Sequence, residues 1–318
     1  TTHHQFGADV STDSRTTASL TINGPTLSGT ASFSADDSAK TVAAAVNNVS
    51  ATTGVTAKAR TNLVLDTVSA TGTYTFDLTG TGTASISTNI TNQSDLRGMR
   101  DAVNAVAGTT GITASMYNGD NSRLMLTSAT GEDIKILNLA NAASSNQTFK
   151  AFTTDYDGVV SGSGTVFGDA TATVLDSLIV SGEVRFTSAG AFSVVDGGTS
   201  GAGTGYMAAN TTSASATTIS SVKIGTQANA NAAIDIIDGA LNKIADQRAN
   251  LGAISNRLDH TVSNLGNVVL NTEASKSRIE DADFAKVTGD LTKSQIMSQA
   301  ATAMLAQANA SKQGVLSL

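Results

Sequence analysis

Cysteine and tryptophan are absent from this chain of 318 residues, and aromatic residues make up only 4% of it. Without cysteine, the chain can form no disulfide, no thiolate metal site and no cysteine nucleophile. The scarcity of aromatic rings leaves little material for an aromatic-anchored interface or for a surface that stacks nucleic-acid bases. Threonine, serine, alanine, glycine and asparagine dominate instead, a composition that can bury small apolar cores.

Positive charge is also scarce, because 19 basic side chains face 26 acidic ones and the net charge is −7. Nucleic acids and anionic membranes are bound through basic patches, so we predict neither as a partner. No apolar run approaches the roughly 18 residues that cross a bilayer. The first residues do not form the basic and then apolar pattern of a cleaved signal peptide.

Histidine occurs three times, as His3, His4 and His260. This set supplies no histidine-based dyad or metal cluster with the usual spacing. Phosphate-loop, dinucleotide-binding and nucleophile-elbow motifs are missing from the sequence as well. We therefore predict a protein that is not an enzyme and that needs no cofactor or metal.

Two acidic clusters could suggest a metal site, and both have a simpler interpretation. The fragment from Asp155 to Gly158 resembles the start of a calcium loop, but no Glu follows at the twelfth position, so we predict a plain turn. The acidic run at 280–283 could be a metal site too. A helix break with an N-cap before Phe284 explains that run better.

An internal repeat organises the first two thirds of the chain. Short alternating segments separated by Gly, Asn and Asp predict β-strands from about 18 to 222. Within this part, the run from Val46 to Ala57 recurs from Val103 to Ala114, a match too long to arise by chance. Flanking segments recur too, at 20–24 with 76–80 and at 62–65 with 123–126. Each copy is predicted to contain a strand, a turn, a short helix, a glycine turn and a strand.

Residues that favour helix ends mark the predicted helix in each copy. Ser38 in the first copy and Ser94 or Asp95 in the second stand where N-caps are expected. Gly54 and Gly111 follow the helices as C-terminal stops. We divide this part of the chain into a connecting segment at 1–17, a first α+β repeat at 18–66, a second at 67–136 and a third β-rich unit at 137–222.

A different period begins at Lys223. Apolar residues recur there at three- and four-residue spacing, which predicts a rod helix of coiled-coil type over 223–281. The residues of this predicted seam are Ile237, Leu241, Ile244, Leu251, Leu258, Val262, Leu265 and Val269. So narrow an apolar stripe needs a partner helix. Since no comparable heptad helix occurs at 1–222, the partner is either another subunit or sequence that precedes Thr1.

The last segment, at 282–318, predicts a second, terminal helix that is rich in alanine. Its small side chains allow the close helix packing of a bundle built from many copies. The residues expected to take part in assembly are Phe284, Val287, Leu291, Ile296 and Met304. The apolar tail at 314–318 would be exposed on a single chain, so we expect an assembly to bury it.

Five short motifs in the last third of the chain carry a family resemblance. They begin at Ala233 (AIDIID), Leu251 (LGAISNR), Asn264 (NLGN), Ser277 (SRIEDADF) and Ala306 (AQAN). In this order they look like the carboxy-terminal region of the bacterial flagellins. The repeats at 18–66 and 71–136 also resemble the flagellin insertion motif.

The resemblance implies an α+β multi-domain fold, in which β-rich variable modules are followed by long coiled-coil-type helices. It implies an extracellular structural subunit of the bacterial flagellar filament, exported without a cleaved signal peptide and polymerised at the filament tip. The implied partners are many copies of the same chain, the filament cap and an export chaperone.

Recognition by an innate immune Toll-like receptor is a further implication of the resemblance. The matching positions are Asn256, Arg257, Asn264 and Asn267. Their interpretation as ordinary polar residues of a helix surface stays open beside it.

In one respect the sequence departs from the family, because the amino-terminal rod helices have no counterpart at 1–222. We therefore expect the sequence to be a fragment or to continue before Thr1. Two other classes of function remain open: a hook–filament junction protein, and a surface adhesin that binds through its β modules. The runs at 264–267 and 277–280 favour the filament subunit over the junction protein.

Overall fold

We describe the fold from a computed structural model of the chain. The residues it describes are 4–7, 19–34, 36–66, 68–141, 147–169, 176–196, 211–214, 219–225 and 227–316. The chain divides into two compact units, Thr1–Ile244 and Ala245–Leu318. The first unit contains all the strands of the described residues, and the second is helical.

The first repeat folds as a hairpin, two short helices and a long strand. The hairpin strands are β2 (Ser19–Asn23) and β3 (Ser28–Ser32). They are followed by α1 (Ala39–Asn48), α2 (Ser50–Thr53) and β4 (Val55–Asp66). The second hairpin strand was not part of the predicted pattern. Its residues are Ser, Gly, Thr and Ala, and only Ala31 is buried, so its apolar alternation is weak.

The second repeat has the same order of elements and adds two strands. It consists of β5 (Gly72–Thr79), β6 (Thr83–Ile90), α3 (Arg97–Ala105), α4 (Ala107–Thr110), β7 (Ile112–Met116), the 3-10 turn η1 (Tyr117–Gly119), β8 (Arg123–Ser128) and β9 (Ile134–Asn141). The prediction of two α+β copies is confirmed by this shared order.

The remaining elements of the first unit are short strands and one turn. They are β1 (His4–Gly7), β10 (Gln147–Thr154), β11 (Val160–Asp169), β12 (Ser177–Val180), β13 (Glu183–Ser188), β14 (Ser193–Asp196), β15 (Thr211–Ser213) and η2 (Ile219–Ser221). Three sheets result, with orders β1-β12-β9-β5-β6, β11-β10-β4-β8-β7 and β15-β14-β2-β3, and β13 pairs with β4 beside the second.

The same side-chain hydrogen bonds fix the helix-to-strand corner in both repeats. In the first, the Asn47 amide donates to the Ala57 carbonyl at 2.9 Å and accepts from the Ala57 N–H at 2.8 Å. In the second, Asn104 makes the same pair of bonds to Ala114 at 2.9 and 2.8 Å. The asparagine thus closes the corner by satisfying two backbone groups of the next strand.

Glycines at the end of each helix pair take the conformation that the sequence predicted. Gly54 and Gly111 both have φ of 70°, the left-handed form that ends helices. At the start of the second repeat's helix, the Asp95 carboxylate accepts from the Arg97 N–H at 3.1 Å and pairs with its guanidinium. The Arg97 hydrogen bonds lower the Asp95 pKa to about 2, so the Asp95 carboxylate at this helix start stays ionised well into acid solution.

Replacing Asn104 by alanine should lower the free energy of unfolding by about 1–2 kcal/mol, because two hydrogen bonds to Ala114 are lost. Asn47→Ala should cost a similar amount, since its bonds to Ala57 are the same. Urea unfolding followed by circular dichroism measures both. The matched control is the neighbouring exposed Asn48→Ala, and a loss as large as that of Asn47→Ala would contradict the role given to the corner bonds.

The first repeat is completed by strands that come after the second repeat in sequence. In the second repeat, β8 returns along β7 and β9 returns along β5. In the first, β13 returns along the first half of β4 and β14 returns along β2. A repeated side-chain bond confirms the equivalence, because Thr56 donates to the Thr187 carbonyl as Thr113 donates to the Thr127 carbonyl, both at 3.4 Å.

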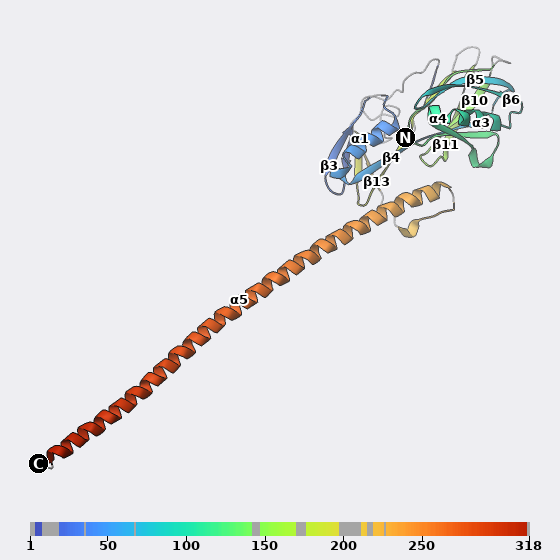
Figure 1. The fold of residues 1–318 in the computed structure, drawn as a ribbon. Helices are drawn as coiled ribbons and strands as arrows, with labels where there is room; N and C mark the ends of the chain where they lie inside the picture. The colour runs from blue at the N-terminus through green and yellow to red at the C-terminus, as the bar shows by residue number, and fades with distance from the viewer. Residues whose placement is uncertain are drawn as a thin grey trace. The chain divides into compact units, whose positions relative to one another are not determined.

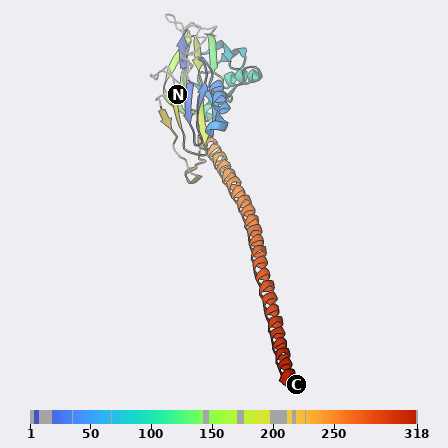
Figure 2. The same cartoon turned by 90° about the vertical axis from the view of Figure 1, so that its left-hand side faces the viewer.

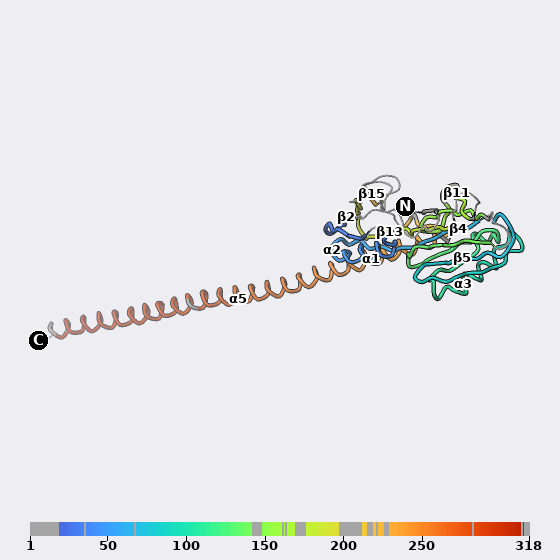
Figure 3. The backbone as a smooth tube through the Cα atoms, turned by 90° about the horizontal axis from the view of Figure 1, so that it is seen from above, coloured from blue at the N-terminus to red at the C-terminus, as the bar shows by residue number. Residues whose placement is uncertain are grey.

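We call residues 19–60 with 183–196 the split module, and residues 61–182 the inserted module. The boundary falls inside β4, where Arg60 pairs with Glu183 of β13 and Thr61 pairs with Ser128 of β8. Figures 1 and 3 show the two modules side by side, with β4 running from one into the other. The second repeat therefore lies within the first.

Each module has its own apolar core. The core of the split module joins residues of both its sequence segments, from Leu20 to Ala57 and at Val194. The core of the inserted module draws on residues from Leu63 to Val180. In the latter, the ring of Phe149 packs edge-on against Tyr74 at 5.1 Å and stacks on Phe167 at 5.9 Å.

Two details of the predicted organisation are corrected by this pairing. The strands expected to form a third β-rich unit at 137–222 are present, but those described pair into sheets with strands of the two repeats. The segments 62–65 and 123–126 are partners rather than equivalents, since Leu63 faces Leu126 and Leu65 faces Leu124 across one sheet. Their similar pattern reflects a shared buried face. The remaining domain boundaries stay predictions.

A single helix of 90 residues, α5 (Gln227–Leu316), follows the strands (Figure 2). The predicted break before Phe284, between a rod helix at 223–281 and a terminal helix at 282–318, is wrong. No proline or glycine lies at 280–284 to interrupt the backbone hydrogen bonds. The acidic side chains stand exposed in water, and Asp281 accepts a hydrogen bond from Ser277 one turn earlier at 3.1 Å.

Candidate assembly surface

The eight predicted seam residues all lie on α5, and all are exposed. Their exposed fractions range from 46% at Ile237 to 67% at Val262. Helical geometry places residues three and four apart on one side, so these eight side chains form one apolar stripe. Arg248 and Ser255 interrupt the stripe in the same register. A long apolar stripe left in water is typical of a surface that packs against another chain or segment.

Two further apolar residues widen the stripe between Leu251 and Val269. Ile254 follows Leu251 by three residues and Val268 follows Leu265 by three, and both are 51% exposed. A strict heptad pattern leaves these two residues out, because it assigns only two positions in every seven to the seam. The helix repeats every 3.6 residues, so positions three apart also belong to the same face.

The five residues expected to act in the terminal helix are exposed as well, between 56% at Leu291 and 74% at Met304. They do not share one face. Phe284, Val287 and Leu291 follow one another at helical spacing, but Ile296 comes nine residues after Val287, about two and a half turns later. Apolar residues around the whole helix predict burial on several sides.

Two of the predicted receptor-contact residues, Asn256 and Asn267, lie on the other side of α5, whereas Arg257 and Asn264 border the widened stripe, three residues after Ile254 and four before Val268. Asn256, Arg257, Asn264 and Asn267 are all exposed. Asn256 and Asn267 are each two residues from a seam leucine, which turns them by more than half of a helical turn away from the stripe. The helix is therefore amphipathic, with two amides opposite the apolar stripe and Arg257 and Asn264 at its edge.

The acidic turn at 155–158 binds its own backbone. The Asp155 carboxylate accepts from the N–H groups of Asp157 and Val159 at 3.0 and 2.8 Å, and the Asp157 carboxylate pairs with Arg185. The predicted plain turn is confirmed. In the described part of the chain, no group of three His, Cys, Asp or Glu side chains could hold a metal ion.

Among the helices of the described residues, none has a segment both long and apolar enough to cross a membrane.

Two family models match this chain. The bacterial flagellin C-terminal helical region matches residues 234–318, which includes most of α5. The flagellin hook IN motif matches twice, at 19–71 and 75–130, the two repeats described above. The chain belongs to the bacterial flagellin family.

Known proteins of similar sequence include two flagellins. The B-type flagellin of Pseudomonas aeruginosa is 37% identical over 289 residues, which cover 90% of this chain and 56% of that protein. Flagellin A of Vibrio cholerae is 51% identical over 102 residues, or 32% of this chain and 27% of that protein. The chain thus spans about half the length of the first relative and about a quarter of the second.

Among solved structures, FliD of Pseudomonas aeruginosa aligns over 77% of this chain and 96% of that chain. The sequence identity is 14% and the TM-score is 0.23.

Proposed function

We propose that the chain is part of a structural subunit of the bacterial flagellar filament, which polymerises through α5 and so builds the propeller of motility. The exposed apolar stripe from Ile237 to Val269 is the observation that carries the proposal. Membership of the flagellin family supports it, because the matched carboxy-terminal region contains this stripe.

Burial of the stripe supplies the free energy of assembly in this proposal. Moving a Leu, Ile or Val side chain from water to a core contributes about 1.5–3 kcal/mol. Since the eight seam residues are about half exposed, their burial contributes on the order of 8 kcal/mol per chain. Association of two proteins costs about 4–15 kcal/mol in lost freedom, so a stable filament needs each subunit to contact several neighbours.

The proposal extends to location and partners. The subunit acts outside the cell, with its β modules on the surface, and the protein is structural rather than catalytic. Its partners are further copies of itself, a filament cap and an export chaperone. The polar residues of α5 at Asn256, Arg257, Asn264 and Asn267 remain a proposed contact for a Toll-like receptor.

Deleting residues 283–318 should abolish polymerisation and leave the β modules folded, because their cores lie entirely within residues 20–194. The deletion is made in the gene that encodes this chain and expressed in a strain without its own flagellin. Electron microscopy then scores filaments, and circular dichroism of the purified protein scores the β modules. Filaments of normal length from the deletion strain would refute the proposal.

A further inference from the structure

The first turns of α5, residues 227–244, belong to the same compact unit as the β modules. One face of these turns is covered, at positions that run from Ala230 to Ala240. Ala233 is 4% exposed, and Asp235 and Ile236 are partly buried, whereas the neighbouring Ile234 and Ile237 are 56% and 46% exposed. The helix therefore rests on the split module along one face, and Asp235 lies at the middle of this contact.

Two cations of the split module bind the Asp235 carboxylate. Lys58 of β4 donates to Asp235 Oδ1 at 2.5 Å, and Arg185 Nη1 of β13 lies 3.5 Å from Asp235 Oδ2. The hydrogen bond to Asp235 is the main reason why the Lys58 pKa is raised above its usual value. Both carboxylate oxygens are engaged, one by each strand.

Arg185 is itself held in place from its other side. Its guanidinium pairs with the Asp157 carboxylate and lies 4.1 Å from the centre of the Tyr156 ring. The Tyr156 N–H donates to Glu183 at 2.7 Å, which fixes the turn that carries the ring. The Arg185 guanidinium is thus held in position independently of the helix, so the Asp235 carboxylate has one defined place to bind.

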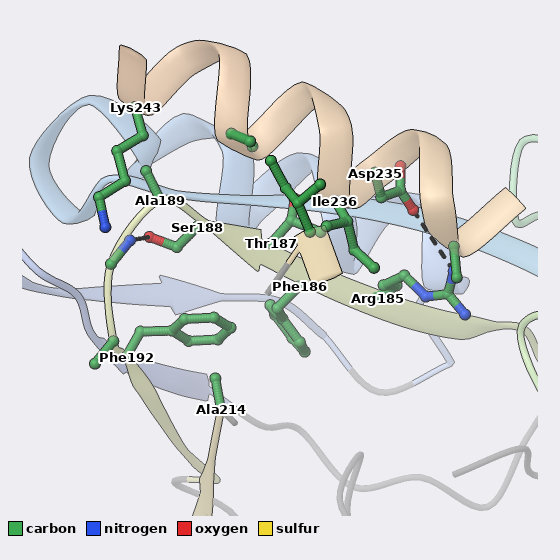
Figure 4. A pocket seen from close by; sticks show the side chains of 16 residues that line it. Arg185, Phe186, Thr187, Ser188, Ala189, Phe192, Ala214, Asp235, Ile236 and Lys243 are labelled. Carbon is green, nitrogen blue, oxygen red and sulfur yellow. Dashed lines mark hydrogen bonds and ion pairs between the residues drawn. The ribbon is translucent and has the colours of Figure 1, made fainter. Parts of the chain in front are cut away.

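A groove of about 770 Å³ lies beside this contact, between the helix and the β13–β14 connection. Phe186 and Phe192 line one wall, and Ile236 and Lys243 line the other (Figure 4). Gly239 of the helix lines the groove as well. A Cβ atom built on Gly239 meets nothing within 4 Å. Well-packed protein interfaces have few voids larger than a water molecule, so the packing of the helix on this side is incomplete.

We propose that the ion pairs of Asp235 form a pivot for the first turns of α5. The groove is the part of the same contact that is still open, and it closes when these turns move onto Phe186 and Phe192. In the open arrangement the ion pairs of Asp235 and the buried Ala233 hold the helix on the split module. Closure adds apolar contacts of Ile236 with the two rings. The chain therefore contains an adjustable joint where the helix leaves the β modules, and this holds for a single chain, whatever it assembles into.

Gly239→Leu tests the open half of the joint. A leucine at this position fills the groove against Phe186 and Phe192, so we expect amide hydrogen exchange at 230–244 to slow at least tenfold in the whole chain. Gly252→Leu is the matched control, since this helical glycine also has open space around its Cβ but lies outside the joint. It gains the same helix propensity. Equal slowing of exchange at 230–244 by the two variants would overturn the proposal.

Asp235→Asn tests the pivot. We expect exchange at 230–244 to become about tenfold faster, while amides of α1 in the split module keep their protection. Lys58→Met removes one ion pair from the other side and should act in the same direction, and Asp246→Asn, an exposed acid further along α5, should change nothing. Unchanged exchange in both Asp235→Asn and Lys58→Met would overturn the pivot.

Discussion

Replacing Leu258 and Leu265 together by aspartate is expected to abolish filament formation and swimming. Both leucines lie in the apolar stripe and are more than half exposed in the single chain. A buried, unpaired carboxylate at a subunit contact costs about 3–5 kcal/mol, and 1.4 kcal/mol is a tenfold change in affinity. Each substitution alone thus weakens association more than about 100-fold, which electron microscopy and sedimentation of the expressed protein measure.

The opposite side of α5 offers a control with the same change of charge. His260→Asp with Ser263→Asp places two carboxylates on exposed positions away from the stripe, and filaments should still form. Circular dichroism should show an equal helix content in both double variants. If the two abolish filaments equally while staying helical, the stripe is not what drives assembly.

Cutting out the inserted module should leave a folded, shorter chain. Ala59 pairs with Val184 in the split module as Met116 pairs with Leu124 in the inserted one. The segment 117–123, which joins β7 to β8, can therefore replace residues 60–183 as the turn between Ala59 and Val184. Because the core of the split module uses no residue of the removed part, we expect cooperative unfolding with a loss of only about 1–3 kcal/mol, including the lost Lys40–Glu132 ion pair.

A second deletion tests the other possible boundary, that of the second repeat as predicted from the sequence. Removing 67–136 takes out β5 to β8 and part of β9, and leaves β12 without its β9 partners and β4 without β8. That chain should bind a hydrophobic dye and unfold without a cooperative transition. Both chains are compared by thermal denaturation, and the split module is not an independent unit if the two behave alike.

The sequence predicted those features that depend on local chemistry. Gly54 and Gly111 were identifiable because few other residues adopt the left-handed conformation that ends these helices. The shared face of the eight apolar residues of α5 was identifiable because helical spacing alone decides which side chains share a face, while their role in packing stays a prediction. Ile254 and Val268 were missed for the same reason, since the heptad count is narrower than the true face of a straight helix.

The nesting of the modules was harder to predict, because β-strand partners can be distant in sequence. A signal was present: Thr127 and Ser128 at the end of β8 recur as Thr187 and Ser188 at the end of β13. With the alanine that follows in each place it is only three residues long, and it was not distinguishable from chance in a chain rich in threonine and serine. The break expected near Phe284 failed because exposed acidic residues are tolerated inside a helix when no backbone group is lost.

The division of β4 between two modules has a mechanical consequence. The polypeptide crosses from one module to the other twice, at Arg60–Thr61 and at Gly182–Glu183, and the two crossings are hydrogen-bonded neighbours in adjacent strands. A module attached through a single strand can rotate freely about that strand. A module attached through two hydrogen-bonded strands resists twisting and bends mainly perpendicular to the plane of the two strands. Liquid drag on the inserted module would therefore be passed to the split module as a torque.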